Sequence, residues 1–282
     1  MKGRLTMRLC AVVAAIAVLA GCGGPAPTAE VIRETVEVPV VETVEVFVTE
    51  EPTVTYERSE TLYVSGSAWG PPNDWNPFIT WSKANTTGTI GFVYETLFMY
   101  DPMTGEWIPW LAESGEWTDA DTYELTLREG IMWSDGEAMM ADDVVFTFEL
   151  GQMYAALWFS PMWEYLDSVT ADGDYGVVFE FTDPLYQEWS NNLYNIPIVP
   201  EHLWADKSEE DITGGMNENP VGSGAYLYET HSEDRNIWVR NDNWWATDLL
   251  GLSVAPERIV DIRFSSNNVA LGAVIAGDVD LS

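Results

Sequence analysis

The chain has 282 residues, 46% of them hydrophobic, which is enough to bury the core of one large domain or two small ones. Acidic residues number 46 against 12 basic residues, so the formal net charge is −34. A surface of this sign repels phosphate backbones, which argues against nucleic acid as a partner and against a polyanionic ligand unless a local basic pocket exists.

The first 22 residues have the features of a secretory signal. Three basic side chains come first: Lys2, Arg4 and Arg8. An apolar run over residues 9–20 follows, and it is shorter than the roughly 20 residues that span a bilayer. Leu19-Ala20-Gly21-Cys22 then resembles the lipobox of bacterial lipoproteins. We expect residues 1–22 to be a lipoprotein signal peptide, with lipid on Cys22 holding the protein to the cell membrane outside the cytoplasm. An ordinary signal peptide with a chance cysteine is the alternative.

The cysteine content agrees with this expectation. The two cysteines are Cys10, which leaves with the signal peptide, and Cys22. The mature chain would then have no thiol for a disulfide, a redox motif or a cysteine-ligated metal.

Residues 23–60 differ in composition from the remainder of the chain. Residues 36–46 alternate apolar and acidic side chains, a period typical of a strand. The segment is nevertheless of low complexity, is interrupted by Pro39 and Pro52, and carries many like charges. We interpret it as an extended acidic tether, with a stray strand as the alternative.

A globular domain is expected over residues 61–282, with an inserted subdomain at about 91–195. The patterns predict five strands or strand pairs, which are 62–65, 122–127, 177–181, the pair 225–228 and 237–240, and 258–264. They predict helices at 91–98, from Asp142 onward, from Asp183-Pro184 onward with Leu185, Trp189 and Leu193 on one face, from Glu201 and at 267–275. Such mixing predicts an α/β or α+β class.

The final residues, Asp278 to Ser282, have the pattern of a strand that is just beginning. We therefore expect the sequence to be the front part of a longer protein.

Strong enzymatic motifs are missing from the sequence. Neither a phosphate-binding Gly-x-x-x-x-Gly-Lys loop nor a Gly-x-Gly-x-x-Gly turn occurs, and Gly222-Ser223-Gly224 has the wrong spacing for a nucleophile elbow. His202 and His231 lie far apart, without partners at zinc-ligand spacing. We expect no catalytic set, no cofactor and no metal.

Tryptophan is the residue type that stands out, with 14 copies. Most are expected in the core. Trp69, Trp75 and Trp81 differ, because they fall in a loop rich in Gly, Pro and Asn at residues 66–82, without apolar periodicity. Loops carry function more often than core segments do. These three rings are either a ligand platform or anchors that plug the core beneath the loop.

Four landmarks in chain order resemble a known family. They are residues 94–101 with 110–114, 123–137 and 141–147; residues 198–204; residues 219–226; and residues 241–245. Together they are similar to the family 5 extracellular solute-binding proteins, the oligopeptide- and dipeptide-binding group. The resemblance implies a periplasmic-binding-protein type II clamshell, of which this chain would hold the first lobe. It also implies a monomer that passes a solute to the permease subunits of an ABC importer.

Residues 70–78 resemble the subgroup that binds β-linked oligosaccharides such as cellobiose. Tryptophan rings suit pyranose faces, and asparagine can both donate to and accept from hydroxyls. The ligand-binding candidates are therefore Trp69, Asn73, Trp75, Asn76, Trp81 and Ser223. Three alternatives remain at this point: an oligopeptide binder of the same family, a secreted glycoside hydrolase, and a purely structural surface protein.

Overall fold

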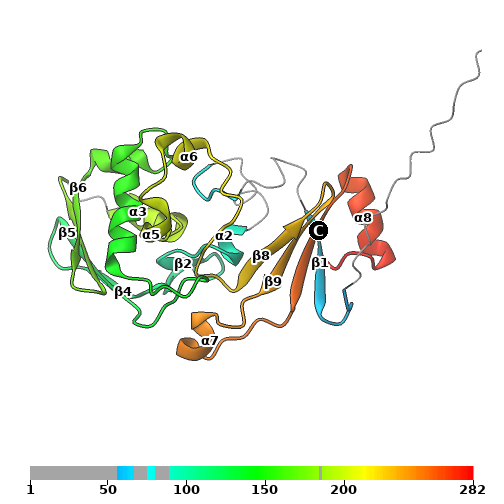
Figure 1. Cartoon of the computed structure of the whole chain (residues 1–282). Coiled ribbons are helices and arrows are strands. Elements are labelled where there is room, and N and C mark those ends of the chain that lie inside the picture. The colour runs from blue at the N-terminus through cyan, green and yellow to red at the C-terminus, as the bar shows by residue number, and fades with distance from the viewer. Residues whose placement is uncertain (1–55, 67–74, 80–88, 184–185, 282) are drawn as a thin grey trace, which may run out of the picture. The chain divides into compact units, whose positions relative to one another are not determined.

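A computed structural model describes residues 56–66, 75–79, 89–183 and 186–281, all within the unit Val54–Ser282 (Figure 1). The first of its two four-stranded sheets has the order β1-β10-β9-β8. Its strands are β1 (Thr61–Gly66), β8 (Tyr226–His231), β9 (Arg235–Arg240) and β10 (Arg258–Arg263). β1 runs parallel to β10, and the other two pairs are antiparallel. This sheet therefore joins the start of the described chain to a segment about 200 residues later.

The second four-stranded sheet is antiparallel throughout, with the order β4-β5-β7-β6. Its strands are β4 (Ala112–Trp117), β5 (Thr122–Leu127), β6 (Leu166–Asp172) and β7 (Gly176–Phe181). Helix α3 (Ala141–Met153) contacts β6 and β7, and buries Val144 and Phe148 against them (Figure 1). Asp143, in the first turn of α3, accepts a hydrogen bond from the Met140 N–H at 2.9 Å, as the helix dipole favours.

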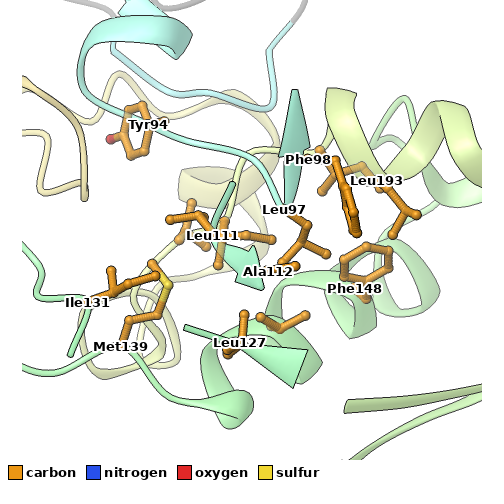
Figure 2. Close-up of a cluster of buried hydrophobic side chains, with 14 of the residues drawn as sticks. Tyr94, Leu97, Phe98, Leu111, Ala112, Leu127, Ile131, Met139, Phe148 and Leu193 are labelled. Carbon is orange, nitrogen blue, oxygen red and sulfur yellow. The ribbon is translucent and has the colours of Figure 1, made fainter. Parts of the chain in front are cut away.

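A hairpin of β2 (Phe98–Asp101) and β3 (Glu106–Pro109) forms the third sheet. Short helices complete the described elements: α2 (Thr89–Phe92), η1 (Ser160–Glu164), α4 (Tyr186–Asn195), α5 (Glu201–Trp204), α6 (Glu209–Gly214), α7 (Trp245–Leu250) and α8 (Asn267–Ala276). The hydrophobic core draws on most of these elements. Figure 2 shows part of it, where Leu97, Leu111, Leu127 and Phe148 meet from segments that lie far apart in the sequence.

Most elements expected from the sequence are present, with ends that differ by a residue or two. The helix expected over residues 91–98 is wrong in extent, because α2 ends at Phe92. The chain beyond it is extended, and its carbonyls pair with distant segments: Val93 with the Gly224 N–H and Leu97 with the Trp110 N–H. Side chains of this stretch are buried on more than one side, which a helix with a single apolar face would not allow.

Helix α4 confirms the expected apolar face in part. Trp189 and Leu193 are buried, whereas Leu185 lies outside the described residues. The last predicted strand is present as a single parallel bridge between Val64 and Leu281. The described residues contain no helix long and apolar enough to cross a membrane.

Candidate functional site

Glu95 lies at the centre of the most densely hydrogen-bonded group of side chains near a pocket. Its Oε1 accepts the indole N–H of Trp110 at 3.0 Å and that of Trp244 at 3.1 Å. Its Oε2 accepts the indole N–H of Trp245 at 2.7 Å and the hydroxyl of Ser223 at 2.7 Å. Each carboxyl oxygen thus has two donors, and the side chain is only 6% exposed.

The three indole rings also contact one another. The ring of Trp110 lies 5.3 Å from that of Trp245 and 6.0 Å from that of Trp244, measured between centroids. The interplanar angles of 65° and 44° are the tilted arrangements that aromatic pairs prefer. Because donors and rings hold each other, the orientation of every indole depends on the Glu95 carboxylate.

Backbone contacts place each member of this group. Trp110 follows β3, and its carbonyl accepts the Arg128 Nε–H at 2.7 Å. Asn241 connects the segment of Ser223 to the start of α7, since its Nδ2 donates to the Gly224 carbonyl at 3.1 Å. The Trp244 N–H in turn donates to the Asn241 carbonyl at 3.1 Å.

The turn that carries Ser223 needs two glycines. The Gly224 N–H donates to the Val93 carbonyl at 3.0 Å, so the two backbones are in close contact. A Cβ at Gly222 would overlap the Val93 carbonyl oxygen, and one at Gly224 would overlap that of Phe92. The glycines let Ser223 reach Glu95 across a backbone-to-backbone contact.

Two opposing effects act on the ionisation of Glu95. Burial raises the pKa of its carboxyl above the ordinary glutamate value, because the charged form loses its hydration. The hydrogen bonds from Trp245, Ser223, Trp110 and Trp244 lower the pKa, since each donor stabilises the carboxylate. Burial is the larger effect, so the net direction is upward.

A pocket of about 510 Å³ lies beside Glu95. This volume is within the range of about 300–1,000 Å³ that small-molecule sites occupy. Aromatic rings make up much of its lining: Phe92, Tyr94, Tyr100, Trp110, Tyr194, Tyr226 and Trp244. Among the described residues that line it, Glu95 is the one carboxylic acid and none is basic. The pocket therefore suits an uncharged ligand with flat apolar faces.

Trp75 and Asn76, two of the residues expected to bind ligand, are both 0% exposed. The ring of Trp75 packs 4.8 Å from Tyr228 and 5.8 Å from Trp238, centroid to centroid. The Asn76 amide donates to carbonyls at the end of α6, at 3.0 Å to both Ile212 and Gly215. These contacts anchor the loop to the core. Direct contact of either side chain with a ligand stays a prediction that this burial does not support.

The other expected site residues divide into two groups. Trp69, Asn73, Trp81 and Cys22 lie outside the described residues. Ser223 is described, and it is 1% exposed, with its hydroxyl on Glu95 as above. The described residues contain no group of three or more His, Cys, Asp or Glu side chains that could hold a metal ion.

Sequence reasoning did not select Glu95, Trp110, Trp244 or Trp245 as site residues. One signal was present, because Glu95 is an acid within the apolar run 90–99. A buried carboxyl requires donors, and indole N–H groups are donors only. The pairing partners lie 15, 149 and 150 positions away, which no local pattern reveals.

Comparison with known proteins agrees with this architecture. Residues 106–282 match the model of the bacterial extracellular solute-binding proteins, family 5 (middle part). The structure is similar to that of the periplasmic oligopeptide-binding protein of an oligopeptide ABC transporter from Thermotoga maritima, solved with bound mannohexaose. The two are 48% identical, with a TM-score of 0.76 over 80% of this chain and 41% of that one. This match confirms the mixed α/β fold of a periplasmic binding protein.

Two curated relatives are more distant. The peptidoglycan-binding protein YepA of Agrobacterium fabrum is 33% identical over 50% of this chain and 23% of its own length. The oligopeptide-binding protein AppA of Bacillus subtilis is 28% identical over 60% of this chain and 31% of its own length. The chain thus spans less than half the length of these relatives.

Proposed function

The chain belongs to the bacterial extracellular solute-binding proteins of family 5, and we propose that it captures a neutral oligosaccharide for an ABC importer. The observation that carries this proposal is the aromatic pocket, in which Glu95 fixes the rings of Trp110 and Trp244. Fixed rings lose little conformational entropy when a ligand arrives, so the binding energy is not spent on ordering them.

The chemistry of the lining favours a sugar. Aromatic rings pack against the C–H groups of pyranose faces. Both oxygens of Glu95 already have two donors each, so the pocket offers no uncommitted charge to an ionic ligand. The mannohexaose-bound relative, at 48% identity, supports the same ligand class. We propose a β-glucoside or mannoside chain, with a cellobiose-like unit as the minimal ligand.

An oligopeptide is the second candidate, and relatives named for peptide binding favour it. A zwitterionic peptide needs charged partners for its termini. The described lining of the pocket does not supply a cation for the carboxylate end. A panel that contains both ligand classes therefore separates the two candidates.

The decisive experiment is isothermal calorimetry of the chain with cellohexaose, mannohexaose and a set of uncharged-side-chain hexapeptides. We expect saturable binding of at least one hexasaccharide and none of the peptides. Trp110→Ala should weaken that binding by about 2 kcal/mol or more, as expected for an aromatic anchor. Trp158→Ala is the control, because Trp158 is 40% exposed and lines a different pocket. Peptide binding without sugar binding would overturn the ligand class.

A secreted glycoside hydrolase is the remaining alternative from the sequence. Hydrolysis requires two carboxyl groups placed on either side of a glycosidic bond, roughly 5–10 Å apart. The described pocket lining presents Glu95 alone, and membership of a solute-binding family also favours capture. Incubation with cellobiose followed by a glucose assay tests this directly, and release of glucose would contradict our proposal.

We further propose an extracytoplasmic location, with the protein held to the membrane by lipid on Cys22 and the segment 23–60 as a tether. The ordered signal features and the Leu-Ala-Gly-Cys sequence support this. A monomer that docks on permease subunits is the proposed working form, because the family name implies capture of a solute outside the cell.

A further inference from the structure

Three aromatic rings extend the pocket lining onto the surface of the β2–β3 hairpin. Tyr100 on β2 and Tyr194 on α4 both line the pocket. Their rings are stacked, with centroids 5.5 Å apart and an interplanar angle of 28°. Trp107 on β3 completes the group, at 4.5 Å from Tyr194 and 5.1 Å from Tyr100. We call Tyr100, Trp107 and Tyr194 the rim triad.

The rim triad is held by the hairpin and remains open to solvent. Tyr100 and Trp107 are directly opposite each other in the β2–β3 pairing, so they form a cross-strand aromatic pair. Tyr100 is 44% exposed and Trp107 is 36% exposed. Next to them, Met99 and Ile108 are also paired across the strands and are 38% and 41% exposed. A cluster of large apolar side chains that stays exposed is typical of an interaction surface.

Continuity with the pocket indicates what occupies this surface. A ligand inside the pocket touches Tyr100 and Tyr194, and Trp107 lies against both of those rings on the outer side. A linear chain that leaves the pocket would therefore cross the triad next. Uncharged sugar rings fit, because the triad has aromatic faces and the protein's net charge of −34 disfavours an anionic partner.

We propose that the rim triad is an outer subsite, which binds the additional rings of an oligosaccharide too long for the pocket. This inference rests on the proposed function, and it adds that Trp107 determines a preference for chain length. Rings inside the pocket depend on Trp110 and Trp244, whereas rings outside it depend on Trp107. The triad therefore contributes to the affinity of a hexasaccharide and not to that of a disaccharide.

The test compares chain lengths on wild type and Trp107→Ala, with mannobiose, mannohexaose, cellobiose and cellohexaose measured by calorimetry. In wild type, the hexaose of the preferred series should bind more tightly than the biose. In Trp107→Ala, we expect about tenfold weaker hexaose binding and unchanged biose binding, since one stacking contact contributes about one such factor. Trp158→Ala, the exposed tryptophan of similar accessibility, should leave both affinities unchanged.

Several outcomes would overturn the inference. Equal hexaose affinity in Trp107→Ala and wild type removes the outer subsite, and so does a loss of affinity shared equally by biose and hexaose. If no sugar binds to wild type, the proposed function fails as well, which distinguishes the two failures. Trp107→Leu keeps apolar bulk in the hairpin and lacks the flat ring. It should show the same hexaose-specific loss if Trp107→Ala does not fold.

Discussion

Trp245 donates its indole N–H to the Glu95 carboxylate at 2.7 Å, although the two residues are 150 positions apart. The other sequence landmarks reach the same glutamate. Ser223 donates to its side chain, and the Ile198 N–H donates to its backbone carbonyl at 3.0 Å. Segments that the sequence shows only as four separate motifs therefore meet at one buried residue.

Glu95→Gln tests whether the carboxylate organises this group. The amide nitrogen of glutamine is a donor, so it would face indole N–H groups that are donors only. We expect a loss of about 1–3 kcal/mol in the free energy of unfolding, from the buried donors left without acceptors. Urea denaturation followed by tryptophan fluorescence measures it. Ser223→Ala, which removes one donor and leaves the three indoles paired, should cost less, and an equal or larger loss there would contradict this account.

The stability of the protein should depend on pH through Glu95. Burial raises the pKa of this carboxyl in the folded state, so folding favours its protonated form. The contribution is complete below the ordinary glutamate pKa and decreases as pH rises through the elevated folded pKa. The difference in unfolding free energy between wild type and Glu95→Gln should therefore fall with rising pH. A difference that grows with pH would show that the donors outweigh burial.

Gly224→Ala should destabilise the turn that presents Ser223. The added methyl group would overlap the Phe92 carbonyl oxygen, and the backbone would have to shift. Overpacking of this kind costs about 1–3 kcal/mol. Gly214→Ala is the matched control, since a Cβ there has no atom within 4 Å. Equal melting temperatures for the two variants would contradict the proposed backbone contact.

Trp75→Ala distinguishes the two roles considered for this ring. Its complete burial against Tyr228 and Trp238 predicts a loss of about 3–5 kcal/mol in stability, as for other large core residues. Thermal unfolding and sugar calorimetry on the same sample measure both quantities. Weaker sugar binding at unchanged stability would instead restore Trp75 to the ligand site.

Cys22→Ser should release the protein from the membrane fraction into the medium. Lipid on this cysteine is the proposed anchor, and stable anchoring requires more than one acyl chain. Fractionation of cells, followed by mass spectrometry of the N-terminal peptide, measures the outcome. A wild-type protein that is already soluble with an intact N-terminus would rule out the anchor.

Local sequence patterns determined much of the secondary structure. β5 was predicted with its observed ends, and α3 and β7 differ by a residue at most, because a strand or amphipathic helix repeats its apolar positions within a few residues. The same patterns, with the landmark motifs, also indicated the family. They failed at residues 93–97, whose apolar side chains read as a helix although the backbone pairs with three remote segments.

The candidate site was decided by tertiary structure. Loop composition selected Trp75 and Asn76, but the fold uses both as buried anchors, because the hydrogen-bonding groups of α6 and the rings of β8 and β9 lie against them. Trp110, Trp244 and Trp245 looked like core residues of unrelated segments. What distinguishes them is a single buried carboxylate that requires donors, and burial is a property of the packed chain that no local pattern contains.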